Sequence, residues 1–398
     1  EKGLDELLHR HIGRRLKASR DLPKAVVESD VTLIAVGTPF NGDLIDLQYV
    51  KQVSKEIGKA LRQKDRYHVV VVKSTVVPGT TDELVLPILE EYSGKKAGPD
   101  FGVGVNPEFL REGEAIADFM NLDRIVLGGI DEASRNVMTE IYTPFESTDI
   151  VRTNNKTAEM IKYSSNSLLA TLISFSNEIG NLCSSIGGID ALEVMNGVHL
   201  DHRFSPILAN GERIKPAMTT YLEAGCGFGG SCFPKDVKAL ISHGVNVGEP
   251  MHLLKAVMEI NKQQPEQVMN RLRKHFPDLG GLNVAVLGLA FKPGTDDMRE
   301  SPTIPIVQEL IAANCKVTAF DPVAQKEAEK IFPINSILYC DSIEKTVSGV
   351  DAILLLTRWP EFKALPVILK AQRASPLLVD GRRLLPKDSV LFYEGIGI

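Results

Sequence analysis

Short apolar runs alternate with amphipathic helical patterns along this chain, and this alternation restricts the possible folds more than any other feature of the sequence. The clearest runs are 31–36, 68–72, 103–105, 123–129, 283–289, 352–356 and 377–380. Continuous apolar runs are typical of strands buried on both faces of a parallel sheet. Because helical segments separate them, the sequence predicts an α/β architecture with two Rossmann-like, doubly wound domains.

The region between the two sets of strands has a helical pattern. Its apolar positions recur with helical spacing at Ile161, Leu168, Leu169, Leu172, Ile173, Phe175, Ile179 and Leu182. The pattern predicts one long helix over 156–185 with two apolar faces, which suits the core of a dimer. With 398 residues available, we expect a first Rossmann-like domain at 1–153, a helical domain at 154–276 and a second Rossmann-like domain at 277–398.

Composition excludes several functional classes. The net charge is −6 and the lysines and arginines do not cluster, so we expect no nucleic-acid partner. No apolar run is long enough to cross a membrane, and the N-terminus has no signal-peptide pattern, so we expect no membrane association. The five cysteines lack the spacing of a metal site, and their odd number without a secretory signal predicts a cytoplasmic protein without a bound metal.

The loop at 227–236 (Gly-Phe-Gly-Gly-Ser-Cys-Phe-Pro-Lys-Asp) is the strongest candidate for chemistry. Its glycines allow backbone conformations closed to other residues and the close approach of a ligand, and Pro234 suits the first turn of a helix. Cys232 would then lie just before a helix N-terminus, with Lys235 one turn further on, and both features favour a reactive thiolate. The alternative is that Cys232 is a small buried apolar residue.

Two loops follow predicted strands at the edge where open α/β sheets bind ligands, namely Gly37-Thr38-Pro39 and 73–81. A dinucleotide fold normally opens with a strand, a Gly-x-Gly-x-x-Gly turn and a helix. No such fingerprint precedes Val31, and the loop at 290–302 of the second Rossmann-like domain does not contain it either. Spacing alone is therefore a weak signal for nucleotide binding.

The acidic segment at 106–113 (Asn-Pro-Glu-Phe-Leu-Arg-Glu-Gly) is a second candidate site. Asn106 can cap a helix and Pro107 can open it, which would place Glu108 and Glu112 on one helix face, four residues apart. Two carboxylates so placed repel each other, and a raised pKa in one of them suits acid–base chemistry. The alternative is that both only complement the helix dipole.

Together these motifs resemble those of the nucleotide-sugar 6-dehydrogenases, the UDP-glucose and GDP-mannose dehydrogenase family. The loop at 227–236 is similar to the family's catalytic-cysteine loop, the segment at 106–113 matches one that borders substrate and cofactor there, and Lys162 and Asn166 match its K-x-x-x-N pattern. The resemblance covers nearly the whole chain and implies an NAD-binding first domain, a catalytic and dimerising middle domain and a nucleotide-sugar-binding third domain. Because the family's dinucleotide fingerprint precedes the segment that matches 31–36, we expect this chain to lack the first βαβ unit.

The resemblance implies oxidation of C6 of a nucleotide hexose to a carboxylate by two NAD⁺ and two hydride transfers, with a cysteine thiohemiacetal and thioester between them. The implied catalytic residues are the nucleophile Cys232, Lys162 and Asn166 for the oxyanions, Asp236 and Thr75 for water, and Glu108 for proton transfer. Cofactor binding is implied for Gly37, Thr38, Pro39, Ser74, Thr75, Glu112, Cys232, Lys235 and Arg299. Substrate binding is implied for Glu108, Phe109, Leu110, Arg111, Lys162, Asn166, Arg203, Tyr221, Leu222, Gly225, Gly229, Phe291, Lys292 and Arg382.

Three segments bear on the choice of sugar nucleotide. The segment at 121–129 and the Cys-Phe-Pro-Lys-Asp string resemble the UDP-glucose enzymes, whereas 93–102 resembles the GDP-mannose enzymes. The Asp-Gly-Arg-Arg string at 380–383 favours oxidation of UDP-glucose to UDP-glucuronate, as in polysaccharide biosynthesis, with GDP-mannose as the alternative. The 2-acetamido-sugar branch has His where this chain has Ser231, which ranks it third.

Two alternatives of other classes remain open at this point. The chain could be a non-catalytic remnant that keeps the fold and a homodimer through the long helix but does not bind NAD. It could also be a 3-hydroxyacid dehydrogenase of related fold, which performs a single oxidation and would not need Cys232. A polar segment at 204–221 has no assigned role, and we expect it to be a lid that faces the substrate.

Overall fold

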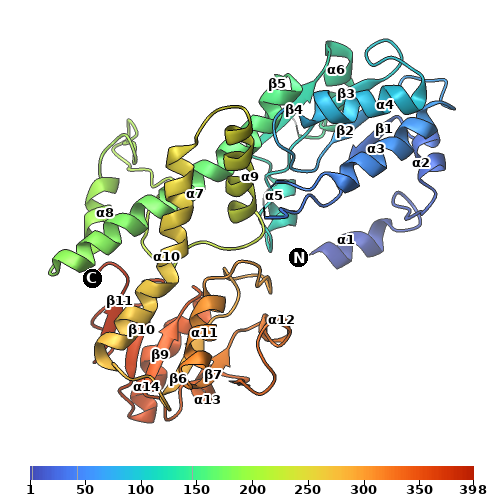
Figure 1. Ribbon diagram of the computed structural model, residues 1–398. Coiled ribbons are helices and arrows are strands. Elements are labelled where there is room, and N and C mark those ends of the chain that lie inside the picture. The colour runs from blue at the N-terminus through green and yellow to red at the C-terminus, as the bar shows by residue number, and fades with distance from the viewer. Residues whose placement is uncertain (2, 43, 146) are drawn as a thin grey trace. The chain divides into compact units, whose positions relative to one another are not determined.

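The computed structural model describes residues 1, 3–42, 44–145 and 147–398. The chain divides into two compact units. Unit 1 comprises Glu1–Ser165 and Lys238–Pro250, and unit 2 comprises Asn166–Val237 and Met251–Ile398. Each unit contains one sheet of mostly or entirely parallel strands with helices on both faces (Figure 1), which confirms the predicted doubly wound α/β class. The bounds of the three predicted domains stay a prediction.

The sheet of unit 1 has five strands in the order β1-β2-β3-β4-β5. The strands are β1 (Val31–Ile34), β2 (Val69–Val72), β3 (Gly102–Val105), β4 (Arg124–Gly129) and β5 (Asp149–Thr153). All neighbours are parallel except β3 and β4, which are antiparallel. Every residue of β2 is buried, because β2 lies inside the sheet and both of its faces are covered.

Helices cover the two faces of this sheet as the alternation of side chains requires. The helices of unit 1 are α1 (Leu4–His11), α2 (Leu22–Glu28), α3 (Gln48–Leu61), α4 (Leu86–Ser93) with a π-helical turn before it (Thr81–Val85), α5 (Ala115–Met120) and α6 (Glu132–Ile141). Val70 and Val72 pack on the face covered by α2, α3 and α4. Val69 and Val71 pack on the opposite face, against α6.

The predicted long helix is present as α7 (Asn155–Ile186), which begins in unit 1 and continues in unit 2. It is followed by α8 (Ala191–His199), a 3-10 turn (Ala217–Tyr221), α9 (Phe233–Asn246) and α10 (His252–His275). Helix α10 continues through Pro265, a residue that usually ends or kinks a helix. Burial of Val268, Met269 and Leu272 in the core of unit 2 offsets the hydrogen bond that the proline cannot donate.

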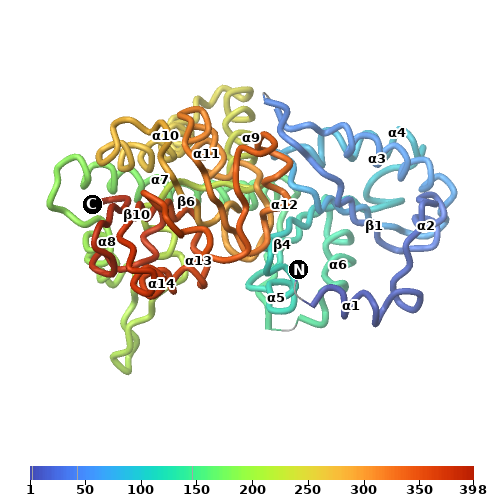
Figure 2. Tube along the Cα trace, turned by 90° about the horizontal axis from the view of Figure 1, so that it is seen from below, coloured from blue at the N-terminus to red at the C-terminus, as the bar shows by residue number. Residues whose placement is uncertain are grey.

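The segment at 204–221 contains a small hairpin. Leu208 N donates to Glu212 O at 2.8 Å, and Ile214 N donates to Pro206 O at 2.9 Å. Arg213 holds the base of the hairpin, since its Nη1 donates to the carbonyls of Leu200 and Ser205 at 2.7 and 3.0 Å. Figure 2 shows this yellow-green segment extending away from the rest of unit 2. Its role as a lid stays a prediction.

The sheet of unit 2 has six parallel strands in the order β11-β10-β9-β6-β7-β8. The strands are β6 (Asn283–Leu287), β7 (Lys316–Phe320), β8 (Ile337–Tyr339), β9 (Ala352–Leu355), β10 (Leu377–Asp380) and β11 (Tyr393–Gly395). Counted from β6 along the chain and read from the β8 edge, this is the order 3-2-1-4-5-6 of a dinucleotide-binding fold. Helices α10 and α11 (Thr303–Ala312) cover one face, and α13 (Ile343–Thr346) and α14 (Leu365–Gln372) cover the other.

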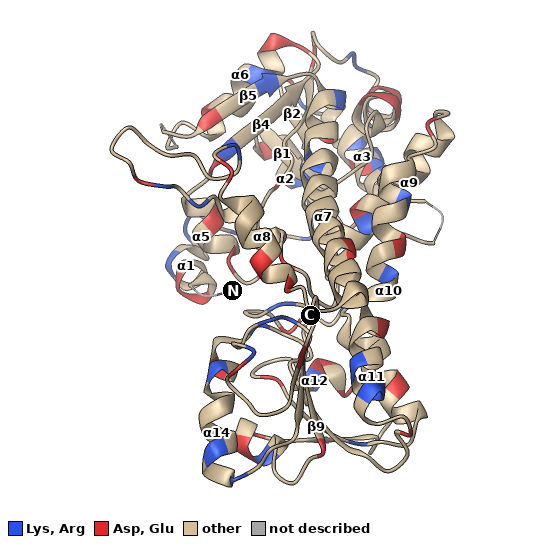
Figure 3. Cartoon of the chain, turned by 90° about the vertical axis from the view of Figure 1, so that its left-hand side faces the viewer, with Lys and Arg blue, Asp and Glu red and all other residues tan. Residues whose placement is uncertain are grey.

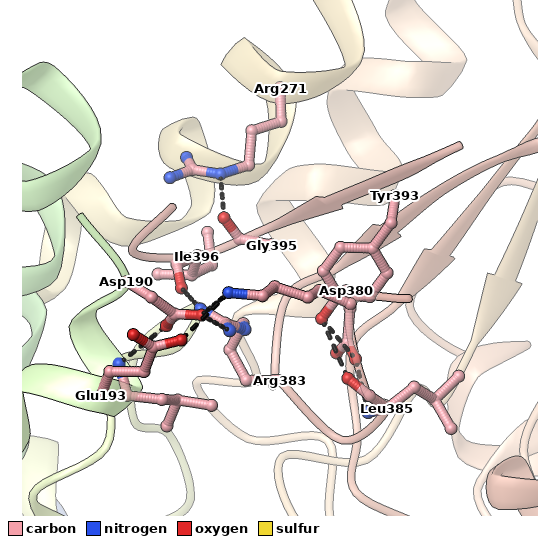
Figure 4. Close-up of polar contacts among 11 residues, drawn as sticks. Asp190, Glu193, Arg271, Asp380, Arg383, Leu385, Tyr393, Gly395 and Ile396 are labelled. Atoms are coloured by element: carbon pink, nitrogen blue, oxygen red, sulfur yellow. Dashed lines mark hydrogen bonds and ion pairs between the residues drawn. The ribbon is translucent and has the colours of Figure 1, made fainter. Parts of the chain in front are cut away.

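A buried ion pair ties the end of this sheet to α8 (Figure 4). Arg383 follows β10, and its Nη2 lies 2.9 Å from Oδ2 of Asp190, the N-cap of α8. The side chains are only 4% and 8% exposed, respectively. Arg383 Nη1 also donates to Ile396 O at 3.1 Å, and Arg271 Nε donates to Gly395 O at 2.7 Å. The last residues of the chain are therefore fixed by two buried guanidinium groups.

We predict that Arg383→Met lowers the stability of unit 2 by about 3–5 kcal/mol, because it leaves the buried Asp190 carboxylate without its arginine partner. Fluorescence of Trp359, the single tryptophan and a residue of unit 2, reports urea unfolding of this part of the chain. Lys345→Met, which breaks an exposed i,i+4 pair with Asp341 in the same unit, is the control and should leave the midpoint unchanged. An equal midpoint for Arg383→Met and wild type would contradict the prediction.

Candidate active site

The predicted nucleophile lies where the sequence indicated. Helix α9 begins at Phe233, and the carbonyl of Cys232 accepts the N–H of Asp236 at 2.9 Å, so Cys232 lies at the helix N-terminus. The thiol of Cys232 is exposed, with its Sγ 3.7 Å from Ser231 Oγ. The alternative of a buried apolar cysteine instead describes Cys226, which is completely buried and whose pKa is raised by desolvation.

The glycines of the cysteine loop are needed for contact with the chain itself. A Cβ on Gly229 would overlap the carbonyl oxygen of Glu300, and a Cβ on Gly230 (φ +81°) would lie 2.7 Å from the ring of Phe291. Gly230 N also donates to Arg299 O at 2.8 Å. The loop that carries Cys232 is therefore seated against the segment that follows β6, at distances that only glycine permits.

Two buried amides and one partly buried amide fix this loop and the residue before it at Gly225, and the sequence analysis did not identify them. Asn177 of α7 accepts Gly225 N at 2.8 Å, and Gln264 of α10 donates to Gly225 O at 3.0 Å. Asn261 accepts Phe228 N at 2.7 Å and donates to Phe228 O at 3.0 Å. Asn177 lies between Ser176 and Glu178, and Gln264 follows Lys262 and Gln263, so no local pattern marked these amides as buried.

A carboxylate with both oxygens engaged lies one turn after Cys232. Asn166 Nδ2 donates to Asp236 Oδ2 at 2.6 Å, and Lys235 Nζ donates to Asp236 Oδ1 at 2.6 Å. Asp236 is only 1% exposed, so these two groups supply the hydrogen bonds that its charge requires. The structure thus brings together four of the predicted residues of unit 2 in the first turn of α9 and on α7.

A second group of predicted residues forms in unit 1. Lys162 of α7 lies 3.3 Å from Glu108, measured from Nζ to Oε1, and Glu108 Oε2 accepts Leu110 N at 2.7 Å. The Phe109 ring is faced by the guanidinium of Arg124 at 4.0 Å and by Lys162 Nζ at 5.3 Å. Lys162 is therefore a buried cation whose nearest anion is one of the predicted acid–base residues.

The predicted helix over 106–113 was wrong. The segment is irregular, and α5 begins only at Ala115, so Glu108 and Glu112 do not share a helix face. Asn106 is not a helix cap, because its side chain is bonded to Lys73, Tyr142 and the carbonyl of Val126. Gly113, at φ +83°, takes a left-handed conformation that interrupts a helix.

The predicted cofactor loops are joined at the carboxyl ends of β1 and β2. Thr38 Oγ1 donates to Thr75 O at 2.8 Å, and Ser74 Oγ donates to Val36 O at 2.7 Å. A Cβ on Gly37 would meet no atom within 4 Å, so the space over its backbone is open. These loops form the edge at which a parallel sheet binds its ligand.

All four predicted ligand arginines have partners within the chain. Arg111 pairs with Asp118 at 2.7 Å, Arg203 with Asp201 at 2.5 Å and Arg299 with Asp297 at 2.8 Å. Arg382 donates to the carbonyls of Leu356 and Gly227 at 2.8 Å each and of Phe291 at 3.4 Å. Arg382 therefore links the cysteine loop to the ends of two strand segments.

The other predicted substrate residues of unit 2 surround the same loop. Leu222 is buried, the Tyr221 ring lies 6.4 Å from that of Phe233, and Lys292 Nζ lies 5.7 Å from the Phe291 ring. Next to them, Arg358 Nη1 pairs with Glu223 at 2.5 Å. Sequence reasoning did not anticipate this pair, because the two residues are distant in the chain.

Two N–H groups of the loop after β6 are already bonded within unit 2. Asp321 follows β7, the position of the acidic residue that binds a ribose in such folds. Its Oδ2 instead accepts Leu289 N at 2.8 Å and Ala290 N at 3.2 Å, and Asp321 is 1% exposed. A ligand of this unit must therefore be recognised by other groups.

Two absences were established for the part of the chain that the structure describes. In residues 1, 3–42, 44–145 and 147–398, no three His, Cys, Asp or Glu side chains are grouped so that they could hold a metal ion. No helix within those ranges combines the length and the apolar character that crossing a bilayer requires.

Three domain models of one family match successive parts of the chain. Residues 1–146 match the NAD binding domain of the UDP-glucose/GDP-mannose dehydrogenase family, 156–263 its central domain and 285–387 its UDP binding domain.

Individual relatives carry both substrate names. A UDP-glucose 6-dehydrogenase of Haloferax volcanii is 40% identical over 401 residues, covering 100% of this chain and 89% of the relative. A GDP-mannose 6-dehydrogenase of Azotobacter vinelandii is 38% identical, with the same coverage of 100% and 89%. The solved structure of a UDP-glucose dehydrogenase from Pyrobaculum islandicum is similar with a TM-score of 0.88 at 36% identity, covering 100% of this chain and 87% of that one.

We predict that Gly229→Ala displaces the cysteine loop, because the new methyl group would overlap the Glu300 carbonyl. The expected cost is about 1–3 kcal/mol, as for other overpacked sites, together with a changed rate of Cys232 alkylation by iodoacetamide. Gly197→Ala is the matched control, since a Cβ there meets nothing within 4 Å and α8 favours alanine. If both variants behave like wild type, the glycine is not needed for this contact.

Proposed function

The chain belongs to the UDP-glucose/GDP-mannose dehydrogenase family, and from this membership we propose that it oxidises C6 of UDP-glucose to the carboxylate of UDP-glucuronate with NAD. The observation that carries the proposal is the exposed Cys232 at the N-terminus of α9, beside the Asn166–Asp236–Lys235 group. A single oxidation of an alcohol would not need such a nucleophile. The four free cysteines besides Cys232 are compatible with a reducing compartment such as the cytoplasm.

The residues that would hold NAD leave the backbone at Gly37 open to a ligand. The bound cofactor supplies a hydride acceptor for each of the two oxidations. Gly37, Thr38 and Pro39 at the end of β1, with Ser74 and Thr75 at the end of β2, would contact it, because the space over Gly37 is open and both loops lie at the ligand-binding edge of the sheet. We also assign Glu112, Lys235 and Arg299 to this ligand, on the strength of the family pattern alone.

Cys232 is needed for the second oxidation. The first oxidation removes a hydride from C6 and the proton from the C6 hydroxyl, and it leaves an aldehyde. The Cys232 thiolate then forms a carbon–sulfur bond to that aldehyde, and protonation of its oxygen gives a thiohemiacetal, which can lose a second hydride. The resulting thioester is cleaved by water, which releases the carboxylate and restores the thiol.

The remaining residues act on the charges that these steps create. Lys162 and Asn166 lie one turn apart on α7, and we propose that both stabilise the oxyanions that develop in these steps. Glu108, held by Lys162 at 3.3 Å, would transfer protons. Asp236, with Asn166 on one oxygen and Lys235 on the other, would orient the attacking water together with Thr75.

The choice between UDP-glucose and GDP-mannose follows from the relatives and the third domain. Relatives of either name are about equally similar to the chain, at 40% and 38% identity. The match of 285–387 to a UDP binding domain and the similarity to a UDP-glucose dehydrogenase structure favour UDP-glucose. NADH production from a panel of UDP- and GDP-hexoses tests this, and a higher kcat/KM for GDP-mannose would reverse the assignment.

We predict that Cys232→Ser lowers formation of UDP-glucuronate by about a thousand-fold or more, the scale expected when a covalent nucleophile is removed. Product is measured by mass spectrometry and NADH by absorbance. Cys340→Ser, at a half-buried cysteine distant from Cys232 in the sequence, is the control and should be active. Uronate formation by Cys232→Ser at the wild-type rate would rule out covalent catalysis, and inactivity of the wild type would favour a non-catalytic remnant.

We further propose a homodimer through α7. Leu168, Phe175 and Leu182 are spaced by seven residues on one face of the helix, and each is about half exposed (58%, 49% and 55%). Between Tyr163 and Ile186 the sole charged residue is Glu178, and Figure 3 shows α7 as a largely uncharged helix. An exposed apolar stripe of this length is typical of a self-complementary interface between two copies.

We predict that Phe175→Glu combined with Leu182→Glu converts the protein to a monomer, because four carboxylates would be buried at a two-fold interface. Light scattering coupled to size-exclusion chromatography gives the mass. Val367→Glu, at an exposed apolar residue of α14, is the control and should leave the mass unchanged. A double variant with the wild-type mass would exclude α7 as the interface.

A further inference from the structure

The loop that contains Ser74 and Thr75 begins with a lysine to which the proposed reaction assigns no role. Lys73 directly follows β2, and Asn106 directly follows β3, the neighbouring parallel strand. Because Val72 pairs with Val105, the two residues lie side by side at the carboxyl edge of the sheet. Lys73 Nζ donates to Asn106 Oδ1 at 2.8 Å.

Asn106 is held on three sides and determines where the acidic segment leaves the sheet. Its Oδ1 accepts from Lys73 and also from the hydroxyl of Tyr142, and its Nδ2 donates to Val126 O at 2.9 Å. Asn106 is 3% exposed, and its backbone N–H donates to Val72 O at 3.0 Å. Glu108 follows two residues later, so the position of Lys73 is transmitted to Glu108 through a buried amide.

Lys73 also acts on Glu108 through charge. The charged groups that face its ammonium are Glu108, on the segment after β3, and Lys162, on α7. Glu108 and Lys162 form an ion pair of 3.3 Å with each other, so Lys73 is the second cation beside one carboxylate. Tyr142, from the end of α6, is the other titratable group in contact with the shared amide.

We propose that Lys73 is a positioning residue for the proposed reaction, one that aligns Glu108 through Asn106 and adds the second positive charge that keeps the Glu108–Lys162 pair ready for proton transfer and oxyanion binding. This inference rests on the proposed function. In this proposal Lys73 touches neither the reacting carbon nor the Cys232 thiol, and it acts through Asn106 and Glu108.

The charge on Lys73 changes close to neutral pH. Burial lowers the pKa of Lys73 from 10.5 to about 8, while Glu108 opposes the shift and Lys162 adds to it. Below about pH 8 the group therefore carries its charge, and above this pH the cluster loses one of its two cations. Since a cation near the oxyanion favours the transition state, the rate should fall as pH rises through this value.

Two substitutions of Lys73 separate charge from shape, with UDP-glucuronate formation as the readout. Lys73→Met should lower kcat at pH 7 by about ten-fold, which corresponds to roughly 1.4 kcal/mol in the barrier. Lys73→Arg keeps a permanent charge, so it should recover most of that loss and abolish the alkaline fall near pH 8, because arginine does not titrate there. A merely structural lysine would not move the pH profile.

Lys64→Met is the matched control. Lys64 is a buried lysine of unit 1, and its Nζ donates to the carbonyls of Val26, Val27 and Ser29. It precedes β2, whereas Lys73 follows it, so the two lie at opposite ends of the same strand. Its removal should lower stability and leave the pH profile of the rate unchanged. If Lys73→Arg is active but keeps the wild-type alkaline fall, the inference is overturned while the proposed function stands.

A second measurement does not depend on activity. In the full chain with ¹³Cε-labelled lysine, the Lys73 resonance, assigned by its loss in Lys73→Arg, should titrate near pH 8. Its midpoint should fall in Glu108→Gln and rise in Lys162→Met, because coupling between two charges is reciprocal. Midpoints that do not move in these variants would overturn the inference even in an inactive protein, whereas an inactive wild type would count against the proposed function.

Discussion

The cysteine loop depends on a contact between two stretches of backbone that leaves no room for side chains. Gly229 and Gly230 face Glu300 and Phe291 so closely that a Cβ at either position would overlap them. The same loop accepts hydrogen bonds from Arg382 and from Asn261 of α10, and Gly225 just before it donates to Asn177 of α7. These contacts fix the position of the loop that leads into the first turn of α9. The glycines suit both this internal docking and the approach of a substrate.

Helix α7 contributes one residue to each of the two groups of candidate residues. Lys162 belongs to the Glu108 group of unit 1, and Asn166 belongs to the Asp236 group of unit 2. One turn of an unbroken helix separates them, so the spacing between a cation and an amide is set by helix geometry alone. The same helix presents Leu168, Phe175 and Leu182 to solvent on another face. A single element thus carries residues of both candidate groups and an exposed apolar stripe.

Local patterns in the sequence predicted most of the fold and the position of Cys232 at a helix N-terminus. Apolar runs indicated the strands, and Pro234 after a glycine loop indicated the start of α9, because these signals are encoded within a few residues. The helix over 106–113 was wrong because tertiary partners took the Asn106 side chain that a helix cap would need. Pro265 inside α10 illustrates a related effect, because burial of the following residues against the core outweighs a lost hydrogen bond.

Side-chain pairs between distant segments were beyond the reach of local patterns. Arg358 and Glu223 are 135 residues apart and meet after folding, and nothing near either residue indicates the other. Arg382 illustrates the same limit, because its chemistry suited a phosphate or a sugar, whereas its hydrogen bonds within the chain go to three carbonyl oxygens.

Asp321 has a consequence for selectivity. A chain with two sheets of related architecture risks capturing one nucleotide at both of them. In the second sheet, the N–H groups of Leu289 and Ala290 already bind the Asp321 carboxylate. A tethered group of this kind competes with free ligands at an effective concentration of about a millimolar. A pyrophosphate at this sheet would therefore have to displace the Asp321 carboxylate or bind to groups other than these two N–H groups.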